Sequence, residues 1–446
     1  MDGNPNPMKP RELLSVTDGV FLTVGMIIGA LIFKAPSTVA GATSGPGEFL
    51  FAWLLGGIVS LCGALVYAEL AARYPDTGGE YVFLARGLGR GVSFLFAWSR
   101  MTVIQTGAIA AVAFVFGDYA SEIFSFGKNS SALWAAAAVL VLTVLNLAGT
   151  LQSKSLQKVM EIILIAGLVA FALAAIAIGG SPRPASGAAG GGSLGFAMIF
   201  VLLAYGGWNE AAYLASEIRD GKRNMTRILV AGVLAVSALY LLVNLGYLAV
   251  LGHGGIKESK AVAADVMRAI AGDRGALLLA FMVCVSVLTT INAAIFTGAR
   301  TNYALGRDFP IFRVLGNWRE AGSTPANALL VQGAITLLLV FAGAATPDGF
   351  NAMVAYTSPV FWTFMYLAGT TLFVFREKDP ERAIFRVPLY PHVPIAFCIM
   401  CLYMLYSSVD YVRNPDYGPK FGFAVVAGLI VMVAGIPLYF ATKRAK

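Results

Sequence analysis

Two glycine-containing stretches in long apolar segments carry the clearest chemistry in this sequence. The first runs from Val24 to Phe33 (VGMIIGALIF) and the second from Leu203 to Glu210 (LAYGGWNE). Because glycine has no Cβ, an apolar helix unwinds most easily where glycine occurs. Unwinding frees backbone N–H groups, which bind an anion at the start of a helix, and C=O groups, which bind a cation at its end. The two stretches therefore predict a pair of helix breaks that hold the charged ends of one small solute.

Backbone groups at the breaks are assigned to the two ends of that solute. We expect the N–H groups of Ala30 and Leu31 to bind a carboxylate. Carbonyl oxygens on either side of the breaks are expected to accept from an ammonium group. The residues of this predicted site are Ile27, Ile28, Gly29, Ala30, Leu31, Leu203, Ala204 and Gly206. An α-amino acid with a neutral side chain fits best, and the alternative is that these glycines only allow close helix packing.

Several ionisable side chains lie in apolar segments, where such residues are candidates for function. Glu210 directly follows the second break, and we expect it to support the break, to titrate or to face the solute. Glu69 and Arg73, one helical turn apart, are expected to form an ion pair. Arg100 is expected either to extend to the surface or to pair with an acid. Lys34 is expected to extend to the outer face of the membrane.

Enzymatic and metal chemistry find little support in the sequence. It contains no HExxH, GxSxG or Walker motif, and its two histidines, His253 and His392, lie far apart. All four cysteines fall in apolar segments, so a disulfide framework is not expected. The net charge of +8 comes from residues spread over short loops, which argues against nucleic-acid binding. We therefore predict no enzyme activity, no metal and no cofactor.

The elements that must position these residues are membrane helices. Of the 446 residues, 58% are hydrophobic and 13% are charged, whereas soluble domains carry about 25% charged residues. The apolar runs are about 20 residues long, as membrane helices require, and barrel strands would be about half that length. The sequence predicts an all-α integral membrane protein with twelve transmembrane helices at approximately 14–42, 47–72, 92–118, 132–149, 157–179, 195–217, 227–251, 275–303, 326–344, 350–375, 390–410 and 421–442.

Charge and loop composition predict how these helices are organised. Most of the 32 Lys and Arg residues fall on one set of alternating loops, which places both termini in the cytoplasm. A Gly/Ala/Pro/Ser-rich outer linker, 181–194, separates a first block of five helices from a second. Because five is odd, the blocks insert in opposite orientations, and a break falls in the first helix of each, as in the inverted repeats of secondary transporters. The predicted divisions are a tail at 1–13, repeats at 14–180 and 195–375, helices 11 and 12 at 376–442, and a tail at 443–446.

These residues resemble the amino acid–polyamine–organocation superfamily, and in particular its L-type amino acid transporter branch with its prokaryotic relatives. Residues 25–33 are similar to the family motif GxIIGSGIF, and residues 203–209 are similar to FAYGGWN. Residues 67–70 (YAEL) and 78–81 (GGEY) match the second helix and the loop after it. The resemblance implies a five-plus-five inverted repeat with broken helices 1 and 6, transport by alternating access, and Asn209 ordering the substrate site.

The sequence also departs from the family pattern. The aromatic gate of helix 6 is Leu203 here, and the lysine found on helix 5 of several relatives is Leu164. On helix 8, Thr289, Thr290 and Asn292 lie near pocket or sodium-like positions of the family. Thr289 and Asn292, with Glu210, are the candidates for coupling or side-chain contact. The loop 118–131 lacks the cysteine that joins animal members to a glycoprotein, so no disulfide-linked heavy chain is expected.

Together, these features predict a secondary transporter in the cytoplasmic membrane of a prokaryote, with free neutral amino acids and the lipid bilayer as its partners. A carrier of cationic amino acids or polyamines, with Glu210 contacting the cation, is one alternative. A membrane solute sensor that uses the same fold is another.

Overall fold

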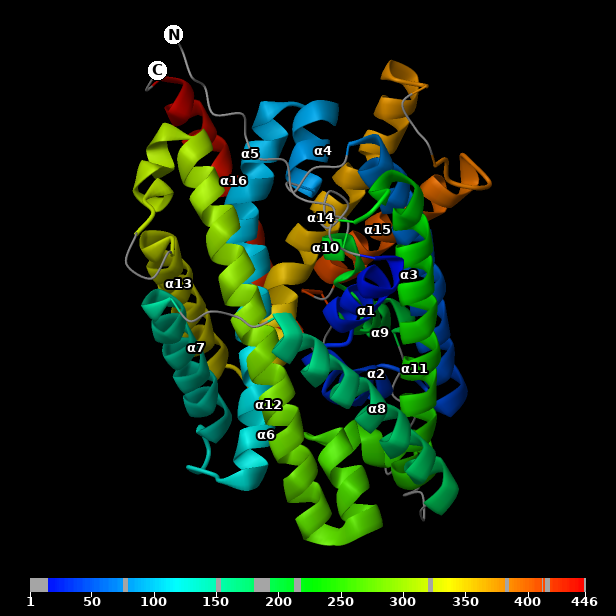
Figure 1. Ribbon diagram of the computed structural model, residues 1–446. Helices are drawn as coiled ribbons and strands as arrows, with labels where there is room; N and C mark the ends of the chain where they lie inside the picture. Colours follow the sequence, from blue (N-terminus) through cyan, green and yellow to red (C-terminus); the bar gives the residue numbers. More distant parts are fainter. Residues whose placement is uncertain are drawn as a thin grey trace.

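The computed structural model of the chain is a bundle of helices, most of which run along a common direction (Figure 1). Within the described ranges, every regular element is a helix, and one isolated β-bridge joins Arg319 to Thr324. The predicted tail 1–13 and nearly all of the linker 181–194 lie outside these ranges. The structure describes residues 15–74, 79–149, 154–179, 193–211, 218–319, 324–381, 385–410, 412–413 and 418–444.

The helices follow one another along the described parts of the chain. In order they are α1 (Val16–Ile27), η1 (Ala30–Phe33), α2 (Ala35–Gly41), α3 (Pro46–Arg73), α4 (Glu80–Gly87), α5 (Arg90–Ser99), η2 (Arg100–Ile104), α6 (Gln105–Ile123), α7 (Ser130–Ala148), α8 (Lys154–Ile178), α9 (Leu194–Ala204), α10 (Trp208–Ala211), α11 (Gly221–Glu258), α12 (Val262–Asp308), η4 (Pro310–Gly316), α13 (Ala326–Ala344), α14 (Gly349–Lys378), α15 (His392–Asp410) and α16 (Gly418–Arg444).

The lengths and composition of these helices are those of a membrane protein. In the described part of the chain, nine helices are long and apolar enough to span a bilayer. Three shorter apolar helices, Val16–Ile27, Ile162–Ile178 and Leu194–Ala204, lie in the segments predicted as helices 1, 5 and 6. Large apolar side chains such as Phe341 and Ile430 are more than half exposed on the bundle surface, as lipid-facing residues are. The chain is a multi-pass helical membrane protein, as the sequence predicted.

The third predicted segment contains an irregularity that the apolar pattern does not reveal. α5 and α6 form one continuous span, but the turn between them, η2, is a π-helix that starts at Arg100. A π-turn carries one more residue than the α-helix and is frequent at functional sites. Here it begins at the only arginine in the middle of that span.

Candidate functional site

The first predicted helix break is present in the structure. α1 ends at Ile27, and the backbone of Ile28 and Gly29 is extended, with ψ angles of 90° and −167°. The short helix η1 then begins at Ala30, and no side chain caps its N-terminus. No capping side chain therefore competes for the N–H groups at the start of η1, where Ala30 and Leu31 were expected to bind an anion.

The second break lies at residues 205–207, between α9 and α10. The N–H group of Gly206 donates to the carbonyl oxygen of Leu203 at 3.0 Å, so that oxygen already accepts one bond within the turn. Gly207 has a φ of +107°, and a Cβ added to it would lie 2.3 Å from the carbonyl oxygen of Met26. The second break therefore lies directly against the end of α1, where the first break begins, and only glycine fits at this point.

A tyrosine that sequence reasoning missed joins the two breaks. The hydroxyl of Tyr240, on α11, lies 3.0 Å from the carbonyl oxygen of Ile27 and 3.1 Å from that of Ala204. The side chain is fully buried. One hydroxyl proton serves both carbonyl groups, and each oxygen keeps lone-pair capacity for a further donor. Freed backbone groups at membrane depth require such partners, because water does not reach them.

Two more tyrosines bond the backbone just after the first break. Tyr247 donates to the carbonyl oxygen of Ile32 at 3.4 Å, and Tyr119 donates to that of Phe33 at 3.0 Å. The sequence holds a signal for this arrangement, because Tyr240 and Tyr247 are seven residues apart and lie on one face of a helix. A buried tyrosine hydroxyl usually has a hydrogen-bond partner, so that face points to polar backbone.

The polar residues after the second break belong to a cluster with α4 and η2. The side-chain oxygen of Asn209 accepts from the N–H of Gly207 at 3.3 Å, and its amide nitrogen donates to Glu80 at 3.0 Å. Arg100 donates to Glu210 at 3.2 Å and lies 3.5 Å from the second oxygen of Glu80. Of the two alternatives for Arg100, pairing with an acid is therefore the one observed. Sequence reasoning did not single out Glu80.

Lys34 does not extend to the membrane surface, so that prediction is wrong. Its side chain is only 5% exposed, and its ammonium nitrogen lies 2.8 Å from Asp118 and 3.7 Å from Asp348. Asp118 comes from α6, and Asp348 immediately precedes α14. Two carboxylates supply the compensation that a buried ammonium group needs, so this lysine does not have to reach water.

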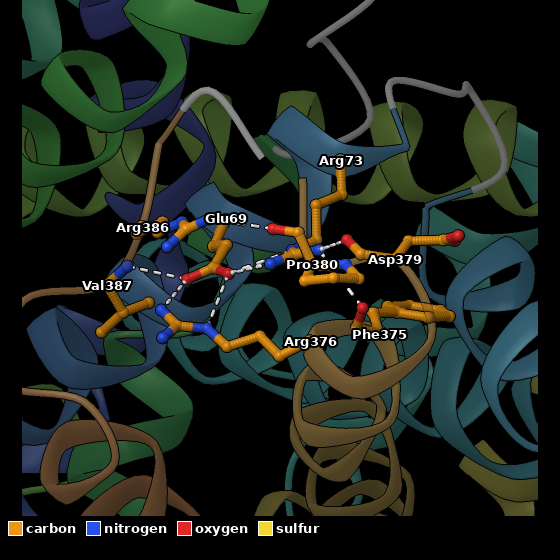
Figure 2. A network of polar contacts seen from close by, with 8 residues as sticks. All are labelled: Glu69, Arg73, Phe375, Arg376, Asp379, Pro380, Arg386 and Val387. Carbon is orange, nitrogen blue, oxygen red and sulfur yellow. Dashed lines mark hydrogen bonds and ion pairs between the residues drawn. The ribbon is translucent and has the colours of Figure 1, made fainter. Parts of the chain in front are cut away.

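The predicted pair between Glu69 and Arg73 is confirmed, but it is part of a larger network (Figure 2). The Glu69 carboxylate is fully buried and also accepts from Arg376 at 2.5 Å and from the N–H of Val387 at 2.7 Å. Arg73 in turn donates to the carbonyl oxygen of Asp379 at 2.7 Å. Figure 2 shows these groups converging from α3, α14 and the segment before α15. Glu69 therefore connects the end of α3 to the end of α14 and to the segment before α15.

The helix 8 candidates Thr289 and Asn292 hydrogen-bond to other groups of the protein. Thr289 is exposed, and its hydroxyl donates to the carbonyl oxygen of Ser286 in the same helix. Its neighbour Thr290 is the residue that faces the first break, with its methyl carbon 4.0 Å from where a Cβ on Gly29 would lie. The side-chain oxygen of Asn292 accepts from Asn146 on α7 at 2.6 Å.

The space beside the second break is nearly closed. A cavity of about 10 Å³ is lined by Ser60, Gly206, Trp208, Asn209 and other residues of α3, α14 and α15. This is close to the least volume that one water molecule needs. An amino acid therefore fits there only if the surrounding helices move apart. Within the described ranges, no group of three His, Cys, Asp or Glu side chains is arranged to hold a metal ion.

Comparison with known proteins gives a consistent match over almost the whole chain. A family model described as amino acid permease matches residues 14–435. The b(0,+)-type amino acid transporter 1 of Mus musculus is 29% identical over 416 residues, covering 90% of this chain and 83% of the relative. The serine/threonine exchanger SteT of Bacillus subtilis (strain 168) is 27% identical and covers 95% of both chains. The human cystine/glutamate transporter is 25% identical, covering 98% of this chain and 87% of the relative.

Proposed function

The chain belongs to the amino acid permease family, within the amino acid–polyamine–organocation superfamily, and from this premise we propose that it carries neutral amino acids across the membrane by alternating access. The family consists of transporters rather than enzymes. The observation that carries the proposal is that Gly207 of the second break lies against Met26 at the end of α1, while Tyr240 bonds a carbonyl oxygen at each break. A zwitterion needs an anion-binding and a cation-binding group within a few ångströms of each other.

The proposed site consists of backbone at both breaks. The N–H groups of Ala30 and Leu31 bind the α-carboxylate, and the carbonyl oxygens of Ile27 and Ala204 accept from the α-ammonium group. Asn209 orders the second break through its bond to Gly207. The remaining candidates are Ile28, Gly29, Leu203 and Gly206 for binding, and Glu210, Thr289 and Asn292 for coupling or side-chain contact.

The charges near the second break favour a neutral side chain on the substrate. Glu210 already bonds Arg100, so a cationic side chain would have to compete with an arginine for that carboxylate. The bacterial relative is named as an exchanger of serine and threonine, which are both neutral. A cationic substrate is the second candidate, because two carboxylates, Glu80 and Glu210, surround the single guanidinium of Arg100.

The proposal includes the architecture that alternating access requires. We assign twelve spans to the nine long and three shorter apolar helices of the described residues, and we group them into inverted repeats at 14–180 and 195–375 followed by helices 11 and 12. The broken helices are then the first of each repeat. The cytoplasmic termini follow from the loop charges. The transporter is proposed to act without a disulfide-linked heavy chain, since residues 118–131 contain no cysteine.

Uptake into proteoliposomes tests this function. Purified protein is reconstituted, and a panel of labelled neutral, cationic and anionic amino acids is supplied to vesicles that are either empty or preloaded with unlabelled amino acid. We expect uptake of neutral amino acids that exceeds the uptake of protein-free vesicles. A requirement for preloading identifies an exchanger, and uptake of cationic solutes alone supports the second candidate. Binding without flux contradicts transport and supports the sensor.

A further inference from the structure

We propose that Glu80 is a positioning residue of the substrate site, an assignment that rests on the proposed function. Its carboxylate holds the amide of Asn209 in the orientation that lets the amide oxygen bond the N–H group of Gly207 in the second break. Glu80 is the first residue of α4, a helix of eight residues that is too short to span the bilayer. Its side chain is nevertheless only 6% exposed. A buried carboxylate is costly unless donors satisfy it, so its contacts indicate what it does.

Donors from three other elements converge on Glu80. One carboxylate oxygen accepts from the amide nitrogen of Asn209 at 3.0 Å and from the hydroxyl of Tyr67 at 2.9 Å. The other oxygen lies 3.5 Å from a guanidinium nitrogen of Arg100. These three residues belong to α10, α3 and η2. The side chain of Glu80 therefore connects the residues after the second break to two membrane-spanning helices.

The chemistry of the two side chains determines how Asn209 is oriented. An ionised carboxylate can only accept hydrogen bonds, whereas a carboxamide has a donating NH₂ group and an accepting oxygen. Glu80 therefore requires the NH₂ group of Asn209 to point toward it, and the amide oxygen points the opposite way. There the oxygen accepts from the N–H of Gly207 at 3.3 Å. Without an acceptor at position 80, only the N–H of Gly207 would favour this orientation of the amide.

This orientation bears directly on the contact between the breaks. Gly207 is the residue whose backbone lies against the carbonyl group of Met26, at the end of α1 just before the first break. A chain of contacts thus runs from α4 through Asn209 and Gly207 to the end of α1. Glu80 acts through Asn209 and needs no contact with the substrate.

The experiment measures the Kd of purified protein for an amino acid that the wild type transports. We expect Glu80→Ala to raise Kd by about tenfold or more, the effect of losing a hydrogen bond to a charged group. Glu80→Gln keeps an accepting oxygen and should stay within about threefold of wild type. If Glu80 served only as a counter-charge for Arg100, the Gln and Ala variants would be equally weak, and the proposal would be overturned.

A swap of the two side chains gives a second test that does not require Glu80→Ala to fold. Asn209→Asp places two carboxylates against each other and should weaken binding strongly. The double variant Glu80→Gln/Asn209→Asp restores one donor and one acceptor with the total charge unchanged, and should recover at least about tenfold of that loss. Failure of the swap to restore binding contradicts the proposed role.

Tyr81→Phe is the matched control on α4. Tyr81 donates to Asp308 at 3.0 Å, away from the breaks. Burial, with Asp308 alongside, raises the pKa of Tyr81 to about 12, so the phenol remains a donor at neutral pH. Loss of the Tyr81 hydroxyl should leave the Kd for the amino acid unchanged. An effect as large as that of Glu80→Ala would mean that any weakening of α4 impairs binding.

A double-mutant cycle separates this proposal from the proposed function. Melting temperatures of wild type, Glu80→Ala, Asn209→Ala and the double variant are recorded without substrate. Coupled effects support the Glu80–Asn209 contact whether or not an amino acid binds, and additive effects refute it. A wild-type protein that binds no amino acid of the panel, together with a coupled cycle, refutes the proposed function alone.

Discussion

Replacing Lys34 with methionine should destabilise the protein by an amount that the structure allows us to work out. The substitution keeps an unbranched apolar chain and removes the charge that Asp118 and Asp348 share. Removing one partner of a buried ion pair costs about 3–5 kcal/mol, because the remaining charge stays buried. The two carboxylates are 18% and 32% exposed and each keeps another hydrogen bond, so we expect the lower end, about 3 kcal/mol.

The charge count of the cluster predicts which second substitution restores stability. One cation and two anions become two anions in Lys34→Met, whereas Lys34→Met/Asp118→Asn has a single anion, the same net charge as the wild type. The double variant should therefore regain at least half of the lost stability. Asp118→Asn alone leaves the pair between Lys34 and Asp348 and should cost only about 1 kcal/mol.

The assay is thermal unfolding in detergent at one fixed heating rate, since unfolding of a membrane protein is commonly irreversible. Lys128→Met serves as the control, because Lys128 is exposed in the loop before α7. A Lys34→Met protein that melts with the wild type would refute the reasoning. So would a double variant whose loss equals the sum of the two single losses.

Three further predictions concern the breaks and the Glu69 network. Gly207→Ala should lower amino acid uptake at matched expression by at least about tenfold, because the added methyl would lie 2.3 Å from the carbonyl oxygen of Met26; normal uptake would show that the breaks need not touch. Tyr240→Phe should weaken substrate binding by about tenfold, since two buried carbonyl groups lose their donor. An unchanged Kd in a binding assay argues against a substrate site formed by both breaks. Glu69→Gln should lower the melting temperature, because a carboxamide cannot accept all the bonds that the carboxylate accepts. It should reduce amino acid uptake less than Asn209→Ala does. Equal losses of uptake would mean that the substrate site is misplaced.

The helices and their interruptions could be predicted from the sequence because both depend on local properties. Apolar runs of about 20 residues mark the spans, and the glycines at 29, 206 and 207 mark where a helix unwinds, whereas Gly25 stays within α1. The structure places the breaks at residues 28–29 and 205–207. The residues that satisfy the freed backbone come from α6 and α11, and only the tertiary fold brings them there.

The error at Lys34 has the same physical origin. Lys34 was expected to extend to the surface, as a lysine does on an isolated helix. Its partners, Asp118 and Asp348, lie far along the chain, and no local pattern reveals that they meet. On helix 8 the sequence pointed to Thr289 and Thr290 alike, and the structure has Thr290 beside Gly29, since one residue turns a helix by about 100°. Predicting which of two adjacent residues faces the first break requires the exact rotation of the helix about its axis.

The π-turn at Arg100 has a consequence for how this chain tolerates insertion and deletion. Its extra residue sets α5 and α6 out of phase by about 100°, the rotation of one helical residue. Deleting one residue between Met101 and Ile104 would restore a regular α-helix and rotate Arg100 away from Glu210 by the same angle, without removing either side chain. A relative that lacks the extra residue aligns with this chain only through a one-residue gap in the middle of a membrane-spanning helix.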